Sequence, residues 1–284
     1  MWARGNDVWR AYIWSSKLKI LWECSRVNSL PVNTFKQKLA ANKVLIGLWC
    51  NFAHLPITEI VSLSGFDWLL LDMEHSPTDL ATIGMLMLAV KNSPTHAVVR
   101  VPSNDMTTIK RALDTGITNL MIPNIRSAEE AAAAVSYTRF APQGLRGVAG
   151  STRGGGYTRY KDYMARANDE IGLVLQIETP EALAELDAIC RTPGVDAVFI
   201  GPSDLAASLG YRGLANGPEV QAEISKAFAV AKAANKAIGI LSTDGNAEKY
   251  LEQGATLVGV GTDVHVMVRA ADELAAKFKD WQGK

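Results

Sequence analysis

The sequence predicts an α/β fold, a single (β/α)8 or TIM barrel, on three observations. Short apolar runs alternate with alanine-rich segments of helical period from Leu45 onward, these runs number eight, and several of them end in a charged residue. A chain of 284 residues has room for two average domains, but a barrel of this kind commonly takes that length. We therefore expect one large core.

The eight expected strands are short, apolar and separated by segments long enough for a crossover helix. They cover residues 45–50, 68–73, 97–101, 119–123, 172–178, 197–201, 237–241 and 256–261. Helical periodicity predicts helices over residues 107–115, 127–139, 180–190, 218–235, 247–253 and 266–281. Several of these begin with favourable caps, such as Ser127 ahead of two glutamates and Thr179 ahead of a proline.

The first part of the chain differs in composition from the rest. Residues 1–31 are expected to form an N-terminal extension and residues 32–284 the barrel domain. The extension carries four tryptophans among basic residues and no continuous apolar stretch of the signal-peptide kind. Two interpretations remain open, a loosely ordered terminus and a helix that binds a partner or an interface.

Charge and cysteine content narrow the class of protein. Lysine plus arginine (29) balance aspartate plus glutamate (29), so we expect small-molecule partners and no nucleic acid. The apolar runs are far shorter than the roughly 20 residues that cross a bilayer, so no membrane span is expected. The three cysteines lie far apart with no metal-ligand or redox spacing, which favours a reducing compartment and a cytoplasmic location.

Two carboxylates stand where neighbouring apolar runs end. Glu178 follows the fifth run, and Asp204 follows the sixth after Gly201-Pro202-Ser203. Because the carboxyl ends of barrel strands meet at the active face, these oxygens are suited to a divalent cation such as magnesium or manganese. Each alone could equally cap the helix that follows it, but their placement on adjacent strands favours a metal site.

Three further residues are candidates for catalysis. His75 follows the second run, where a histidine can act as a general base, although it can equally be a hydrogen-bonded loop residue. Arg100 lies among apolar strand residues, so it either forms a structural ion pair or holds an anion. Asp114 ends a helix, where a carboxylate opposes the dipole and calls for a partner. No strand end presents a lysine, so Schiff-base chemistry fits poorly.

A long glycine-containing excursion separates the fourth and fifth runs. Gly154-Gly155-Gly156 lies in it and matches no dinucleotide or phosphate-loop pattern. If it stands at the barrel mouth it can act as a mobile cover, and the alternative is an ordinary surface loop.

Four segments together resemble the HpcH/HpaI family of metal-dependent (class II) pyruvate aldolases. They are residues 66–77 (FDWLLLDMEHSP), 98–102 (VVRVP), 176–178 (QIE) and 201–205 (GPSDL). The likeness runs from about Phe35 to Lys279 and is most similar to the 2-dehydro-3-deoxyglucarate and 4-hydroxy-2-oxoheptanedioate aldolases of the family, notably through residues 109–116 and 201–210.

The resemblance implies a role for each matching residue. Glu178 and Asp204 would be the metal ligands, with Asp204, Gln176 and Ser203 at the bound substrate. His75 would be the general base, Asp114 would orient it, and Arg100 would stabilise an enolate. The implied metal is Mg²⁺ or Mn²⁺, with Co²⁺ and Zn²⁺ as further options.

The implied reaction is reversible cleavage of a 4-hydroxy-2-oxo acid to pyruvate and an aldehyde through a pyruvate enolate, which makes the chain a carbon–carbon lyase. The resemblance also implies a homo-oligomer, a hexamer in relatives. Two rivals remain: a CoA-thioester lyase of the citrate lyase beta type, and a non-catalytic barrel that binds a metal or an oxo acid.

Overall fold

The computed structural model describes residues 28–243 and 245–282 of the chain. The expected N-terminal extension falls largely outside these described residues. At its end, Leu30 is buried against Phe140 and Tyr163, and the Leu30 N–H donates to the Asp162 carboxylate. Packing on the barrel therefore includes residue 30.

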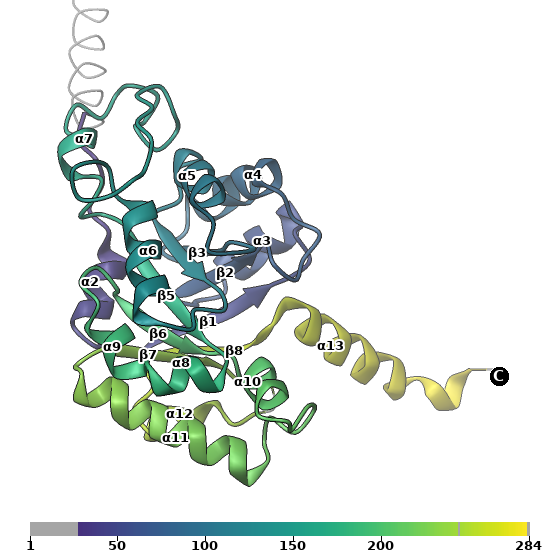
Figure 1. Cartoon of the computed structure of the whole chain (residues 1–284). Coiled ribbons are helices and arrows are strands. Elements are labelled where there is room, and N and C mark those ends of the chain that lie inside the picture. The colour runs from purple at the N-terminus through teal and green to yellow at the C-terminus, as the bar shows by residue number, and fades with distance from the viewer. Residues whose placement is uncertain (1–27, 244, 283–284) are drawn as a thin grey trace, which may run out of the picture.

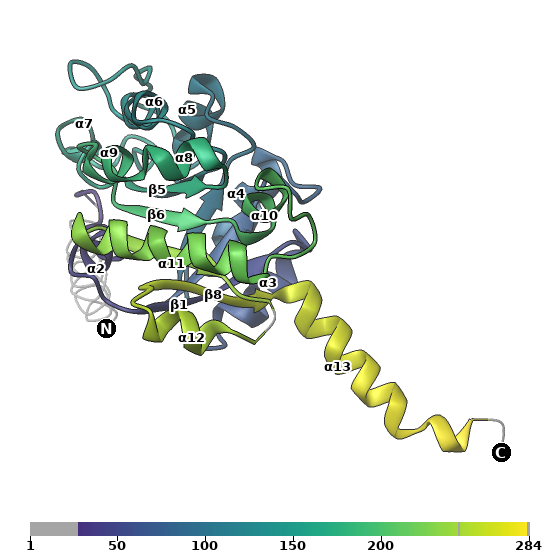
Figure 2. The ribbon, with the colours of Figure 1, turned by 60° about the horizontal axis from the view of Figure 1, so that its bottom comes forward.

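The predicted TIM barrel is confirmed. Eight parallel strands close in chain order, β1-β2-β3-β4-β5-β6-β7-β8 (Figures 1 and 2). Their bounds are β1 Leu45–Cys50, β2 Trp68–Asp72, β3 His96–Arg100, β4 Asn119–Ile122, β5 Gly172–Ile177, β6 Ala197–Ile200, β7 Ala237–Leu241 and β8 Leu257–Thr262. All eight predicted strands are present, each within a residue or two of its expected ends.

Helices surround the barrel and connect its strands. They are α2 Thr34–Ala40, α3 Leu55–Ser62, α4 Leu80–Val90, α5 Met106–Asp114, α6 Ala128–Thr138, α7 Tyr163–Arg166, α8 Pro180–Ala184, α9 Leu186–Arg191, α10 Pro202–Ser208, α11 Pro218–Ala233, α12 Ala247–Glu252, α13 Asp263–Lys277 and the 3-10 turn η1 Lys279–Trp281. None of the helices in the described ranges is long and apolar enough to cross a membrane.

Some helix predictions were incomplete. The single helix expected over residues 180–190 is two, because Glu185 leaves helical geometry between α8 and α9. The last helix begins three residues earlier than expected, with Thr262 accepting a hydrogen bond from the His265 N–H as its N-cap. Five helices, α2, α3, α4, α7 and α10, were not predicted. Four of them have eight residues or fewer, too short for a clear helical period, and α4 is too uniformly apolar to show a polar face.

Large rings fill the interior of the barrel, and glycines on neighbouring strands make room for them. Trp68 and Phe199 meet edge to face at 6.2 Å between ring centroids. A Cβ at Gly47 would stand 2.2 Å from the Trp68 ring, and one at Gly239 would stand 2.4 Å from the Phe199 ring. Each glycine pairs in register with the ring it faces. These rings pack the interior of the barrel below the strands' carboxyl ends.

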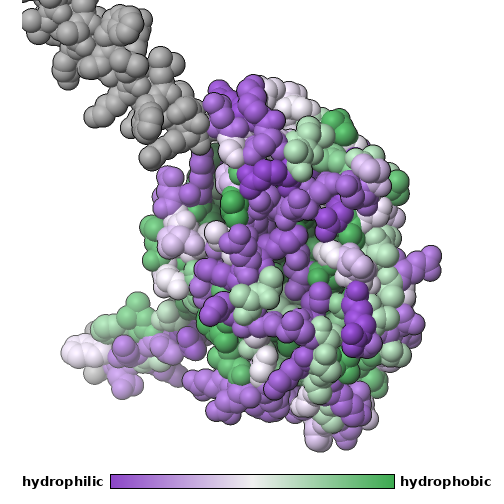
Figure 3. Space-filling model, turned by 90° about the vertical axis from the view of Figure 1, so that its left-hand side faces the viewer, coloured by the Kyte–Doolittle hydropathy of each residue, from purple (hydrophilic) through white to green (hydrophobic). Residues whose placement is uncertain are grey.

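The last helix leaves the barrel instead of covering it. Figures 1 and 2 show α13 extending away from the molecule, and Figure 3 shows it as a projection with hydrophobic surface. Asp263 is its one buried residue, while Met267, Leu274 and Phe278 are more than half exposed. On β8, close to the point where α13 begins, Val260 is 38% exposed, whereas the other residues of this strand are buried. The eighth place in the helical ring is therefore not filled by this chain's own helix.

Candidate active site

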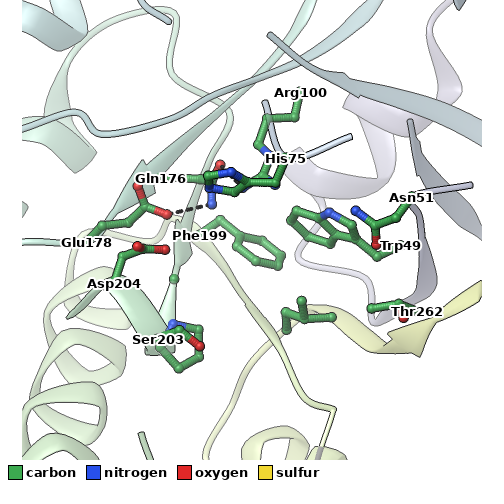
Figure 4. A pocket seen from close by; sticks show the side chains of 13 residues that line it. Trp49, Asn51, His75, Arg100, Gln176, Glu178, Phe199, Ser203, Asp204 and Thr262 are labelled. Atoms are coloured by element: carbon green, nitrogen blue, oxygen red, sulfur yellow. Dashed lines mark hydrogen bonds between the residues drawn. The ribbon is translucent and has the colours of Figure 1, made fainter. Parts of the chain in front are cut away.

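A pocket of about 240 Å³ opens at the carboxyl ends of the strands (Figure 4). It brings together six of the predicted site residues: His75, Arg100, Gln176, Glu178, Ser203 and Asp204. Asp114 is not among the residues that line it. The remaining lining residues are Trp49, Asn51, Phe199, Gly201, Pro202, Leu241 and Thr262. Six of the seven predicted site residues therefore share one pocket at the carboxyl ends of the strands.

Glu178 is a buried carboxylate held in one orientation. It follows directly after β5 and is 6% exposed. The Gln176 side-chain amide donates to its Oε1 at 2.8 Å, and the Asn124 backbone N–H donates to its Oε2 at 3.1 Å. Burial, with the negative charges of Asp204 and Glu74 nearby, raises the pKa of Glu178 to about 7. The site therefore stores unfavourable negative charge that a cation would relieve.

Asp204 and Ser203 enter the pocket from a different direction. They lie in the first turn of α10, after the tight Gly201-Pro202 connection, and both are exposed. Figure 4 shows the Asp204 carboxylate beside that of Glu178. A carboxylate in the first turn of a helix is favoured by the helix dipole. The helix-capping interpretation of Asp204 is not supported by a hydrogen bond, because the N-cap is Gly201 and no side-chain cap bond is formed there.

Arg100 forms a buried ion pair with Asp72, the last residue of β2. Its Nε donates to Asp72 Oδ1 at 2.8 Å and its Nη2 to Asp72 Oδ2 at 2.6 Å. Burial alone would raise the pKa of Asp72, but the hydrogen bonds and charge of Arg100 hold that pKa below its usual value. The guanidinium also lies 4.9 Å from the Trp49 ring centroid. Of the two expectations for Arg100, the ion pair is present, and it fixes the guanidinium beside the pocket.

Glu74 joins Arg100 to His75. Arg100 Nη1 lies 2.9 Å from Glu74 Oε2, and the same oxygen lies 4.0 Å from His75 Nε2. Burial raises the pKa of Glu74, and the positive charge of Arg100 offsets this only in part. The His75 side chain is 66% exposed, so it stands at the solvent side of the pocket. Glu74 is thus the carboxylate beside His75 within this chain.

The expected contact between Asp114 and His75 is not formed in this chain. Asp114 is the last residue of α5, and its Oδ1 pairs with Arg146 Nη2 at 3.1 Å. Helix α5 runs back from the carboxyl end of β3 towards the amino end of β4, so its last residue lies at the opposite end of the barrel from His75. Within one chain, therefore, Asp114 does not reach His75.

The glycine-containing excursion also lies away from the pocket. The Gly154 N–H donates to the Asp114 backbone carbonyl at 3.3 Å, and the Lys161 N–H donates to that of Asn28 at 2.9 Å. Both contacts are at the amino ends of the strands. A cover over this chain's own pocket is therefore not formed by the excursion, contrary to the first of the two interpretations.

The acidic pair has the composition of a partial metal site. Glu178 and Asp204 are hard oxygen donors on adjacent elements, and their mutual repulsion helps to raise the pKa of Glu178. Among the described residues, no group of three or more His, Cys, Asp or Glu side chains is close enough to hold a metal alone. The residues thus fit a cation that takes two protein ligands and leaves positions open for water or substrate oxygens.

Some lining residues were missed by sequence reasoning. Asn51 lies one residue after β1 and donates to Asp72 Oδ2 at 3.1 Å, and Thr262 ends β8. Their position at strand ends is the signal that would have identified them. Leu241, at the end of β7, carries no polar group that would have drawn attention.

Comparison with known proteins agrees with this geometry. The family model described as HpcH/HpaI aldolase/citrate lyase matches residues 45–270. A protein of Klebsiella pneumoniae named 5-keto-4-deoxy-D-glucarate aldolase is 47% identical over 253 residues, covering 89% of this chain and 99% of the relative. A protein of the same name from Citrobacter koseri is 46% identical over the same length, with 89% and 98% covered.

Solved structures give the same assignment. An HpcH/HpaI aldolase/citrate lyase family protein from Burkholderia cenocepacia superposes with a TM-score of 0.85 at 37% identity, covering 87% of this chain and 100% of that one. An HpcH/HpaI aldolase from Desulfitobacterium hafniense gives 0.80 at 29% identity, with 87% and 97% covered. This chain therefore belongs to the HpcH/HpaI aldolase/citrate lyase family.

Proposed function

We propose that the protein is a carbon–carbon lyase that reversibly cleaves a 4-hydroxy-2-oxo acid to pyruvate and an aldehyde. The observation that carries the proposal is the pairing, in one pocket, of the buried Glu178 beside Asp204 with an Arg100 fixed by Asp72. The curated relatives at 46–47% identity are named 5-keto-4-deoxy-D-glucarate aldolase. They support a sugar-acid-derived oxo acid of this kind as the substrate, although 4-hydroxy-2-oxoheptanedioate belongs to the same chemical class.

A divalent cation is part of the proposal. Glu178 and Asp204 are the residues that would hold it, and their hard oxygens favour Mg²⁺ or Mn²⁺ over Co²⁺ or Zn²⁺. When bound, it supplies Lewis-acid polarisation of the substrate's 2-oxo group. Gln176 donates to Glu178 Oε1, so it keeps that carboxylate aimed into the pocket.

The chain's own residues carry the proton and charge movements. His75 lines the pocket at its solvent-exposed side. It takes the proton of the C4 hydroxyl, directly or through water. The C3–C4 bond then breaks, the aldehyde leaves, and its bonding electrons pass to the pyruvate enolate. Arg100 provides fixed positive charge where this negative charge develops, and protonation at C3 yields pyruvate. Ser203, which also lines the pocket, is available to bind the substrate's polar groups.

A pyruvate-release assay tests this function. The full chain, treated with a chelator and freed of metal, would be mixed with 5-keto-4-deoxy-D-glucarate or 4-hydroxy-2-oxoheptanedioate, and pyruvate would be followed by coupled reduction to lactate. We expect turnover only after Mg²⁺ or Mn²⁺ is restored, and a loss of at least about 100-fold in Glu178→Gln. Full activity of metal-free Glu178→Gln would contradict the proposal. CoA, added separately in calorimetry, should give no binding heat, because heat would favour the citrate lyase beta rival.

The proposal includes self-association. Helix α13 projects with exposed Met267, Leu274 and Phe278 while Val260 on β8 is partly uncovered, so α13 of one copy is suited to the barrel of another. Light scattering would give the assembly mass, for which a hexamer is expected. A monomer at micromolar concentration would contradict this part. A cytoplasmic location fits the buried free thiols of Cys50 and Cys190.

A further inference from the structure

A buried carboxylate joins the start of α13 to the loop that follows β1. Asp263, the first residue of α13, is 4% exposed. Its Oδ1 accepts from the Asn51 N–H at 2.9 Å and from the Val264 N–H at 2.8 Å, and its Oδ2 accepts from the Phe52 N–H at 3.2 Å. Two segments far apart in sequence are thus tied by backbone hydrogen bonds to one side chain.

The bonds continue from this loop into the pocket. Asn51, held by Asp263 at its backbone, donates from its side chain to Asp72 Oδ2 at 3.1 Å. The same Asp72 oxygen accepts from Arg100 Nη2 at 2.6 Å. Ser76 Oγ donates to the Asn51 backbone carbonyl at 2.6 Å, which ties the loop to the segment carrying His75. Figure 4 shows Asn51 beside Trp49 on the wall opposite Glu178.

Asp263 is a buried carboxylate with two hydrogen bonds to the backbone of the loop after β1. It does not line the pocket, and among the described residues it forms no ion pair with a lysine or arginine. A buried carboxylate without such a partner is costly unless hydrogen bonds satisfy it, and three backbone N–H groups and the positive end of α13 do so here. Two of those three donors belong to the loop, so the loop's position depends directly on this side chain.

We infer that Asp263 is a positioning residue for the reaction: it sets Asn51, and through Asn51 the orientation of the Asp72–Arg100 pair. This inference rests on the proposed aldolase function. Because Arg100 acts where enolate charge develops, a displaced Arg100 affects the transition state more than substrate binding. A merely structural role for Asp263 would lower stability and leave the kinetics of the folded fraction unchanged.

The test compares Asp263→Asn with Asp272→Asn, which removes the same charge from an exposed position on the same helix. Asparagine keeps one acceptor and turns an amide towards a loop N–H, so the loop shifts. We expect kcat of Asp263→Asn to fall about 10- to 100-fold, since misplacement on the order of an ångström has that effect, while KM changes less than about 3-fold. Asp272→Asn should match the wild type. A wild-type kcat in folded Asp263→Asn overturns the inference.

A double-mutant cycle tests the route through Asn51. If Asp263 acts by placing the Asn51 amide, Asn51→Ala lowers kcat, and the double variant Asn51→Ala with Asp263→Asn is within about 3-fold of the worse single variant. Losses that multiply in the double variant would show that the two residues act independently, and would overturn the proposed route.

Hydrogen exchange separates this inference from the proposed function and from failure to fold. In the wild type, peptides containing Asn51 and Phe52 should exchange slowly. In Asp263→Asn these peptides and the peptide containing Asp72 should exchange faster. Asp272→Asn should exchange like the wild type. If the wild type releases no pyruvate, the proposed function fails, yet this exchange pattern still supports the coupling. Fast exchange at residues 51–52 in the wild type, or no change in Asp263→Asn, overturns it.

Discussion

Gly201 lies so close to Glu178 that a Cβ atom at position 201 would stand 2.3 Å from Glu178 Oε1 and 2.9 Å from its Cγ. Such a distance is shorter than any van der Waals contact, so the Gly201→Ala side chain and the carboxylate cannot both keep their places. A glycine directly after β6 is therefore required for the Glu178 side chain, which follows β5, to keep its position in the pocket. This relationship leads to the first prediction.

Gly201→Ala should weaken the cation site. The displaced carboxylate loses its alignment with Asp204, and we expect the concentration of Mg²⁺ that gives half-maximal pyruvate release to rise about 10- to 100-fold. Gly84→Ala is the control, because a Cβ there meets nothing within 4 Å and a helical alanine is favoured over glycine. An unchanged metal dependence in Gly201→Ala would show that Glu178 is not a ligand.

Asp72→Asn should destabilise the protein as well as impair catalysis. The Asp72 and Arg100 side chains are 0% and 7% exposed, so removal of the carboxylate's charge leaves a buried guanidinium without its main partner. We expect a loss of about 3 kcal/mol in the free energy of unfolding, measured by urea titration. Glu74→Gln is the comparison: Glu74 is 21% exposed and makes one contact with Arg100, so its loss should stay below about 1 kcal/mol. Equal losses in the two variants would contradict this ranking.

The arrangement of the barrel could be predicted from sequence because each strand carries its own local signal. Glu178 and Asp204 were placed correctly because a residue that follows an apolar run in an α/β barrel stands at the active face. The same rule places Asp114, which ends α5, at the other end of the barrel from the pocket of its own chain. Long-range partners gave no such signal: nothing local to Asp263 indicates that it bonds to residues 51 and 52.

The packing partner of helix α13 could not be predicted from the sequence. Its amphipathic period predicts a helix, and the helix is present, but the period does not specify which surface it covers. In an isolated barrel the eighth helix would pack on β8 and β1, whereas here its apolar residues are exposed and Val260 is partly uncovered. The choice between a helix's own barrel and a neighbour's depends on the geometry of the turn at Thr262 and Asp263, which the hydrophobic pattern does not encode.

The stability of the metal-free protein should decrease as the pH rises. The pKa of Glu178 is raised from 4.5 to about 7, so the folded state binds this proton more tightly than the unfolded state does. The contribution of this proton to the free energy of unfolding is fully present below about pH 4.5 and is lost as the pH rises through about 7. It amounts to about 3 kcal/mol. In chelator, Glu178→Gln should remove this part of the pH dependence in urea titrations, and the exposed Glu129→Gln should retain it. An unchanged slope in Glu178→Gln would contradict the assignment.

The same proton should compete with the cation. A carboxylate must be ionised to bind a metal, and half of the Glu178 side chains are protonated near pH 7 in the metal-free protein. Mg²⁺ or Mn²⁺ affinity, measured by calorimetry, should therefore fall towards tenfold per pH unit below about 7 and level off above pH 8. Binding in two buffers of different ionisation enthalpy should reveal a proton released near pH 6.5, and Glu178→Gln should release none. Affinity that is constant between pH 5.5 and 8 would contradict this prediction. It would mean that Glu178 is already ionised before the cation binds, and that burial does not raise its pKa to about 7.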